Sequence, residues 1–144
     1  MSAGCEIVIQ NGAGADTVLL TRVEDWLAEL VDELAPQAAT LTVRLAGDSE
    51  VRALNQELRG KDRPTDVLSF EGGETIEGLH LGDVLISLDA ARRQASELGH
   101  GLLREVEELL LHGILHCLGH DHETDDGEMN ALELHLRAKW ISDA

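Results

Sequence analysis

The sequence predicts one α+β domain, in which a mixed four-stranded sheet is packed by about five helices. The chain has 144 residues, the size of one compact unit that buries a core without disulfides. Hydrophobic residues make up 43% of the chain, which argues against intrinsic disorder. Strand and helix patterns alternate in the first half, and helix patterns alone fill the last third. We therefore expect residues 1–144 to form a single domain.

Each element has its own signal. Short β-branched runs and alternating apolar residues predict strands at residues 5–10, 40–46, 67–70 and 79–87. Apolar residues at helical spacing predict helices at residues 17–35, 49–59, 88–98, 102–118 and 125–140. Capping residues are expected at the starts of four of these helices: Asp16 or Thr17, Asp48 or Ser49, Ser87, and Asp125. Glycines are expected to form the turn at Gly72-Gly73 and to end helices at Gly60, at Gly99 or Gly101, and at Gly119.

The chain is strongly acidic. Eleven Lys and Arg residues stand against 28 Asp and Glu residues, a formal net charge of −17. Such a field repels nucleic acids and anionic membranes, so a polyanionic substrate would need a local basic patch or a partner that presents it. Three aromatic residues are too few for a nucleic-acid reader built on rows of stacking rings. Two cysteines, no signal-peptide pattern and no long apolar run predict a cytoplasmic protein without a membrane segment.

Four of the seven histidines fall within eleven residues: His112, His116, His120 and His122. His112 and His116 are four residues apart on a predicted helix, so their Cβ atoms lie roughly 5–6 Å apart on one face. Two imidazoles so placed can converge on one metal ion at about 2.0–2.1 Å.

The third ligand depends on where the helix ends. His120 continues the spacing, but a straight helix would carry it roughly 12 Å along the axis from His112. If Gly119 ends the helix, the chain turns back and His122 can reach the ion. We therefore expect His112, His116 and His122 as ligands, with His120 as the competitor. Three protein ligands leave a position for water, typical of a catalytic zinc ion, although imidazoles also suit other divalent transition metals.

The neighbours of the histidines carry further hypotheses. Gly113 stands where the HExxH motif of many metalloproteases has its glutamate, so the general base of that chemistry is missing. We expect Gly113 to allow a close approach or a simple packing contact. Asp121 is a candidate for proton transfer or for orienting a ligand, and a turn role is equally open. Glu105 and Glu108 either orient the histidines or lie on a solvated face. Cys117 is expected in the core.

A basic cluster lies in the middle of the acidic chain. Arg59, Lys61 and Arg63 place three of the eleven basic residues within five positions. Arginine can grip a phosphate with two hydrogen bonds and offset charge in a transition state, so the cluster is a candidate RNA-backbone site, although solvated loops have the same composition. Asp66 and Asp83 are candidate carboxylates, but each flanks a predicted strand and could equally anchor backbone.

Three separated stretches carry a specific combination of motifs. The run from His112 to His122, HGILHCLGHDH, matches the pattern H-G-x-L-H-L-x-G-x-D-H except that Cys117 replaces leucine. Upstream lie LN at 54–55, RGKD at 59–62 and PTDVLSF at 64–70, followed by LGD at 81–83. In this order the motifs resemble the YbeY family of bacterial rRNA-maturation endoribonucleases, closely over about residues 40–125.

The resemblance implies a function and site residues. It implies a zinc site at His112, His116 and His122, and it matches Arg59 to an arginine with a role in RNA cleavage. It also implies a single-strand-specific endoribonuclease acting in 16S rRNA 3′-end maturation and ribosome quality control, with the small ribosomal subunit or a pre-ribosomal particle as partner. Two alternatives stay open: a zinc hydrolase of another class, such as a metalloendopeptidase, and a non-catalytic ribosome-assembly factor with a structural metal.

Overall fold

The computed structural model describes residues 4–119 and 127–141, and in these ranges the order of elements is the predicted one. The elements are β1 (Glu6–Asn11), α1 (Thr17–Leu34), β2 (Ala38–Ala46), α2 (Asp48–Arg59), β3 (Val67–Thr75), β4 (Gly78–Ser87), α3 (Leu88–Leu98), α4 (Leu102–Cys117) and α5 (Glu128–Trp140). The strands form one sheet in the order β1-β2-β4-β3. β1, β2 and β4 are parallel, and β3 is antiparallel to β4, which confirms the mixed α+β fold.

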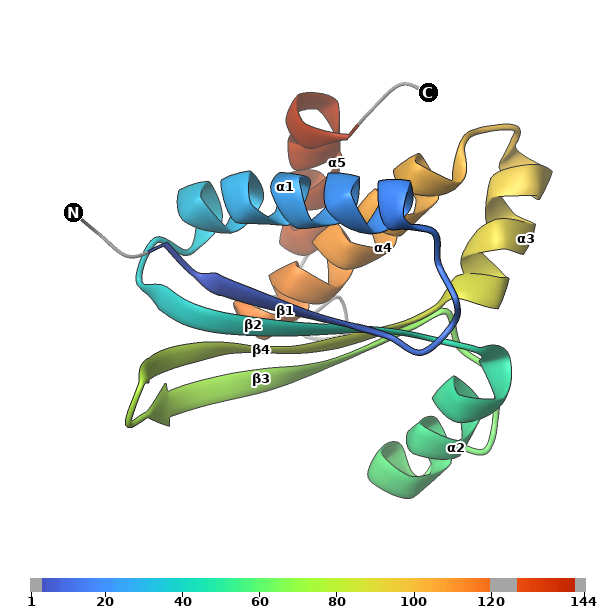
Figure 1. Ribbon diagram of the computed structural model, residues 1–144, viewed down its shortest axis with the longest axis horizontal. Coiled ribbons are helices and arrows are strands. Elements are labelled where there is room, and N and C mark those ends of the chain that lie inside the picture. Colours follow the sequence, from blue (N-terminus) through green and yellow to red (C-terminus); the bar gives the residue numbers. More distant parts are fainter. Residues whose placement is uncertain (1–3, 120–126, 142–144) are drawn as a thin grey trace.

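The helices cover the two faces of the sheet unequally (Figure 1). α1 and α4 lie across one face, α3 and α5 pack against α4, and α2 lies at one end of the opposite face. The main core fills the first interface and includes the fully buried Val23, Leu27, Leu41, Val43, Leu110 and Ile114. A smaller cluster under α2 consists of Ala46, Val51, Leu68 and Leu85.

α4 approaches the sheet closely because Gly113 has no side chain. A Cβ atom at Gly113 would lie 2.6 Å from Val84 Cγ1 on β4 and 3.5 Å from Val67 Cγ2 on β3. Since the first distance is shorter than a van der Waals contact, any larger residue would push helix and sheet apart. The expected close approach is confirmed, and the neighbouring element is the sheet.

The β3–β4 hairpin corrects one prediction. Gly72 and Gly73 were expected to form the turn, but both lie within β3, and the turn falls between Thr75 and Gly78. A Cβ atom at Gly72 would lie 1.9 Å from the carbonyl oxygen of His80. Glycine is therefore required at position 72 by close contact between two strands.

Two predicted helix caps are confirmed. The Asp16 carboxylate accepts a hydrogen bond from the Leu19 N–H of α1 at 2.8 Å, and the Ser87 hydroxyl accepts one from the Ala90 N–H of α3 at 3.1 Å. Gly60 ends α2 in the left-handed conformation, with φ at 69°.

Two other helix starts differ from the prediction. α2 has Gly47 at its N-cap position, so neither Asp48 nor Ser49 caps it. The Asp48 N–H at the start of the helix donates to the Asp89 carboxylate of α3 at 3.0 Å. α5 begins at Glu128, and Asp125, the expected cap, lies outside the described residues.

Asp48 ties the start of α2 to the start of α3. Its carboxylate accepts hydrogen bonds from the Ser87 hydroxyl at 2.6 Å and from Arg93 Nη1 at 2.7 Å. The Arg93 hydrogen bond, followed by that of Ser87, holds the pKa of Asp48 below its ordinary value. Since Arg59 is the last residue of α2, this attachment helps to fix the direction of the helix that carries Arg59.

We expect Gly113→Ala to lower the free energy of unfolding by about 1–3 kcal/mol, the usual cost of overpacking a core. The added methyl group meets Val84, whose β-branched side chain has few other rotamers. In a Val84→Ala background the obstructing atoms are gone, and alanine favours a helix over glycine by about 1 kcal/mol. The same substitution should then cost little or raise stability. Urea unfolding of the four proteins measures this coupling, and an equal loss in both backgrounds would contradict it.

Candidate active site

A polar cavity of about 310 Å³ lies where α2, β3 and α4 meet. Its lining residues are Arg59, Thr65, Asp66, Val67, Ser69, Glu71, His112 and His116. Arg59 stands at the C-terminal end of α2, the strand residues come from β3, and the histidines come from α4. The fold thus brings Arg59 to the same cavity as His112 and His116, although the arginine and the histidines are far apart in the sequence.

The two histidines converge through their Nε2 atoms. The distance between these nitrogens is 3.1 Å, and the rings meet edge to face with their centroids 4.6 Å apart. Two nitrogens held at about 2.0–2.1 Å from one ion, at a roughly tetrahedral angle, lie about 3.3 Å apart. The pair therefore fits two ligands of one metal ion.

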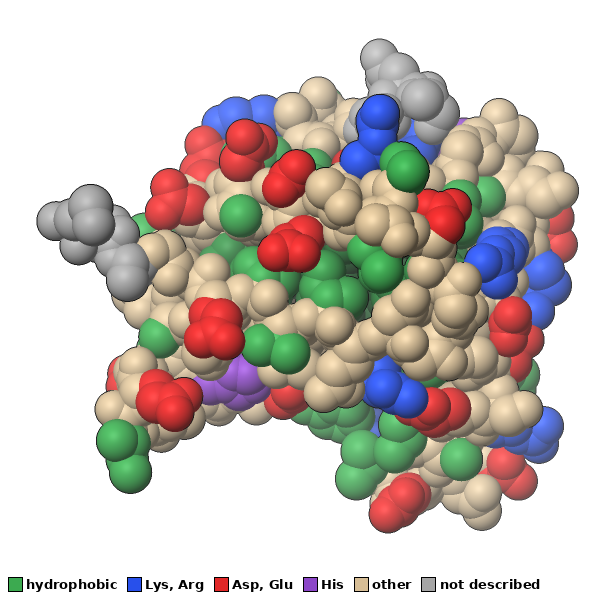
Figure 2. All heavy atoms as spheres, in the orientation of Figure 1, with side chains coloured by type: hydrophobic (Ala, Val, Ile, Leu, Met, Phe, Trp, Pro, Cys, Tyr) green, Lys and Arg blue, Asp and Glu red, His purple; other side chains and the backbone are tan. Residues whose placement is uncertain are grey.

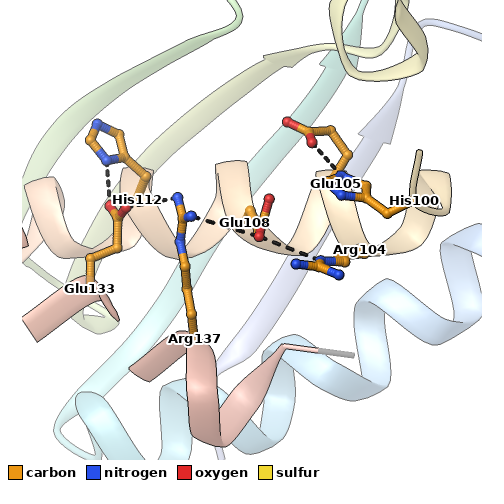
Figure 3. Close-up of polar contacts among 7 residues, drawn as sticks. All are labelled: His100, Arg104, Glu105, Glu108, His112, Glu133 and Arg137. Atoms are coloured by element: carbon orange, nitrogen blue, oxygen red, sulfur yellow. Dashed lines mark hydrogen bonds and ion pairs between the residues drawn. The ribbon is translucent and has the colours of Figure 1, made fainter. Parts of the chain in front are cut away.

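The other ring nitrogen of His112 contacts α5. His112 Nδ1 lies 2.6 Å from Glu133 Oε1, and Glu133 Oε2 accepts a hydrogen bond from Arg137 Nη2 at 2.9 Å (Figure 3). The Glu133 side chain is only 8% exposed. A carboxylate paired with a guanidinium accepts hydrogen bonds, so Nδ1 is the donor, and Nε2 is the ring nitrogen that faces His116.

Glu105 and Glu108 do not lie on a solvated face. Glu105 is buried on α4 and lies 2.6 Å from His100 Nε2, and no contact with His112 or His116 joins it to the described part of the site. Glu108 is 12% exposed and lies 3.6 Å from Arg104 Nε and 3.7 Å from Arg137 Nη1. Among the described residues, Glu108 is connected to His112 through Arg137 and Glu133 of α5.

His100, Glu105 and Glu108 form a second group that could hold a metal ion. One ligand atom from each lies within 4.8 Å of the others, the only such group among the residues that the structure describes. It is distinct from the predicted histidine trio. Figure 3 shows, however, that its carboxylates already face His100, Arg104 and Arg137. The contact with His100 ties Glu105 to the segment between α3 and α4, and the ion pair with Arg137 ties Glu108 to α5.

Lys61 and Arg63 lie on the exposed loop that follows α2. Buried Asn55 anchors this loop: its side chain donates to the Arg63 carbonyl at 3.0 Å, and its own carbonyl accepts from the Lys61 N–H at 3.2 Å. Within the described part of the chain, Arg59 lines the cavity and these two residues do not. Their role in binding RNA stays a prediction.

The two candidate aspartates are separated by the sheet. Asp66 lines the cavity, its carboxylate accepts from Gln94 Nε2 at 3.2 Å, and its carbonyl accepts from the Ser87 N–H at 2.9 Å. It therefore anchors backbone while presenting a carboxylate to the site. Asp83 lines a different cavity beneath α2, on the face opposite to its neighbour Val84. Asp83 is therefore not part of the histidine site.

Cys117 is a core residue, as predicted. It is buried, and its Sγ donates a weak hydrogen bond to the Phe70 carbonyl at 3.6 Å. Burial, with smaller contributions from the charges of Asp83 and Glu71, raises the pKa of the Cys117 thiol to about 11. The sulfur is therefore protonated at neutral pH, unlike the thiolate that binds metals.

The end of α4 has the predicted form. Gly119 has φ at 95°, and its N–H donates to the His116 carbonyl at 2.9 Å, so the helix ends directly after the second histidine. His120, Asp121 and His122 lie outside the described residues. The choice of third ligand and the role of Asp121 stay predictions.

Sequence reasoning did not single out Glu133 or His100. Glu133 had a local signal: it shares the buried face of α5 with Met129 and Leu136, at the spacing i, i+4 and i+7. A carboxylate in an apolar stripe needs a partner, which marks it for attention. His100 follows Gly99 at a helix end and has no comparable signal.

The length and hydropathy of the described helices can be compared with those that a membrane span requires. None of those that the structure describes is long and apolar enough to span a bilayer.

Comparison with known proteins identifies the family. The family model described as Endoribonuclease YbeY matches residues 9–140. Endoribonuclease YbeY of Solibacter usitatus is 49% identical over 117 residues, covering 81% of this chain and 76% of that protein. The Aquifex aeolicus protein of the same name is 50% identical over 103 residues, covering 71% of this chain and 69% of its own. The solution structure of TM1509 from Thermotoga maritima matches with a TM-score of 0.61 and 30% identity, covering 93% of this chain and 91% of that one. The chain belongs to the YbeY endoribonuclease family.

Proposed function

We propose that this protein is a zinc-dependent, single-strand-specific endoribonuclease of the cytoplasm. Its proposed substrate is 16S rRNA, which it matures at the 3′ end and monitors in ribosome quality control. One observation carries the proposal: Arg59 lines the same polar cavity as two imidazoles whose Nε2 atoms are 3.1 Å apart. Family membership supplies the nuclease activity, and the cavity supplies groups that suit a phosphodiester.

We assign the metal ligands to His112, His116 and His122. The first two are supported by the distance between their Nε2 atoms and by the hydrogen bond that engages His112 Nδ1. The third rests on the sequence motif. When bound, a zinc ion would supply a Lewis acid for a phosphoryl oxygen and would acidify water.

Arg59 is the residue that we assign to the scissile phosphate. Its guanidinium can donate two parallel hydrogen bonds to phosphate oxygens and stabilise the negative charge that develops on them. Asp121 is proposed as the proton-transfer group. Of the described residues, Asp66 and Glu71 are the carboxylates that line the cavity, so they are the alternatives to Asp121.

The distribution of acidic and basic side chains limits which surface of the protein can bind RNA. α1 exposes five acidic side chains and one basic one: Glu24, Asp25, Glu29, Asp32, Glu33 and Arg22. Figure 2 shows acidic side chains spread over this face, whereas several basic side chains lie along the right-hand edge. We assign RNA-backbone contacts to Arg59, Lys61 and Arg63, on the side of the site away from α1.

His116→Ala should lose the bound metal and reduce cleavage of single-stranded RNA to the level of chelator-treated wild-type protein. The control is His135→Ala, which removes an exposed histidine of α5. Metal analysis of untagged protein and an RNA-cleavage assay measure both effects, with casein as a second substrate. Casein cleavage would favour a peptidase, and normal rRNA processing in cells without bound metal would favour a non-catalytic assembly factor.

Arg59→Ala should lower kcat/KM for RNA by about 10²–10³-fold, the typical loss when one group that stabilises transition-state charge is removed. Arg59→Lys keeps the charge but lacks the planar fork, so we expect partial activity. Metal content should be unchanged in both variants. Arg92→Ala, at an exposed position on α3, is the matched control. Unchanged kcat/KM in Arg59→Ala would remove the arginine from the mechanism.

The enzyme should cleave rRNA faster in a pre-ribosomal particle than as naked RNA at physiological salt. A net charge of −17 weakens free association with a polyanion, so other proteins must supply affinity. Cleavage rates of the two substrates, measured at several salt concentrations, check this expectation. Equal rates at physiological salt would contradict it.

A further inference from the structure

We propose that Glu133 is a positioning residue, which fixes the tautomer and orientation of His112 so that Nε2 is the atom presented to the metal. This inference rests on the proposed function, because it assigns a role toward the metal that His112 is proposed to bind. None of the residues that line the cavity belongs to α5. Through Glu133, however, this helix would fix the position of one metal ligand.

Glu133 links His112 to a chain of ion pairs between α4 and α5. Oε1 contacts His112 Nδ1 at 2.6 Å, and Oε2 accepts from Arg137 Nη2 at 2.9 Å. Arg137 Nη1 then lies 3.7 Å from Glu108 Oε1, which lies 3.6 Å from Arg104 Nε. Figure 3 shows these side chains in a row along α4, with Glu133 and Arg137 reaching in from α5.

The chemistry of the pair decides which nitrogen of His112 can coordinate a metal ion. A carboxylate has only acceptor atoms, and the guanidinium on its other oxygen favours that form. His112 Nδ1 must then carry a proton, so in the neutral ring the lone pair lies on Nε2. This atom lies 3.1 Å from His116 Nε2 and borders the cavity. Histidine ligands in metal sites are typically held in this way by a carboxylate on the second ring nitrogen.

Burial argues that Glu133 is more than a helix–helix contact. Its side chain is 8% exposed and shares the buried face of α5 with Met129 and Leu136. A carboxylate taken out of water is costly unless its partners compensate, and here those partners are His112 Nδ1 and the Arg137 guanidinium. An orienting role explains why a carboxylate stands at this position.

The test uses the full chain with Glu133→Gln, which keeps the shape but not the charge, and Glu133→Ala. Glu128→Gln is the matched control, because it removes the same charge from an exposed position on the same helix. Three quantities are measured: zinc affinity by competition with a chelator, the ¹⁵N shifts of the His112 ring in metal-free protein, and the melting temperature.

We expect zinc affinity to fall about 10–100-fold in Glu133→Ala and less in Glu133→Gln, the range typical of lost orienting partners. In wild type and Glu128→Gln the ring shifts should report a proton on Nδ1, and in both Glu133 variants they should report a mixture of tautomers. A purely structural Glu133 would lower the melting temperature without changing the tautomer.

The outcomes separate this inference from the proposed function. An unchanged His112 tautomer in both variants overturns the inference, and so does a changed tautomer with wild-type zinc affinity. If the wild-type protein binds no zinc, the proposed metal site fails, and the ring shifts alone then decide whether Glu133 fixes His112. If Glu133→Ala does not fold, the isosteric glutamine variant gives the same two readouts.

Discussion

The closeness of α4 to the sheet is the constraint on which the site depends. Gly113 allows the helix to lie against Val84 and Val67, at a distance that no larger residue permits. His112 and His116 therefore stand beside β3, whose residues form the adjoining wall of the cavity. The other side of α4 is free to receive α5, which brings Glu133 to the outer nitrogen of His112. Gly113 thus helps to set the relative positions of the histidines on α4, the cavity wall on β3 and Glu133 on α5.

Arg59 reaches the same cavity through separate anchors. Asp48 holds the start of α2 to Ser87 and Arg93, and Asn55 holds the loop beyond its end. Asp48 and Asn55 belong to α2, which lies on the opposite face of the sheet from α4 (Figure 1). The Arg59 side chain and the imidazoles are therefore held in place by different sets of contacts. The acidic side chains of α1 make that face unfavourable for the approach of a polyanion (Figure 2).

Local features were predictable because their causes lie within a few residues of the chain. The caps at Asp16 and Ser87 and the helix end at Gly119 follow from nearby hydrogen bonds. The prediction of a turn at Gly72 was wrong because the reason for glycine at this position lies on the paired strand. A carbonyl group there would collide with any Cβ atom at position 72. Glu105 was assigned to a solvated or orienting role because its partner, His100, lies beyond the start of its helix. In the site, Arg59 and the histidines followed from spacing and motif, whereas Glu133 depends on how two helices dock.

The packing of Gly113 also bounds what protein engineering could do with this scaffold. In HExxH peptidases a glutamate at this position acts as the base. Here position 113 faces the interior of the protein. A glutamate at this position would place its carboxylate against the methyl groups of Val84 and Val67, without a hydrogen-bond partner there. Introducing the HExxH motif here would therefore destabilise the fold and would not supply a general base for peptide hydrolysis.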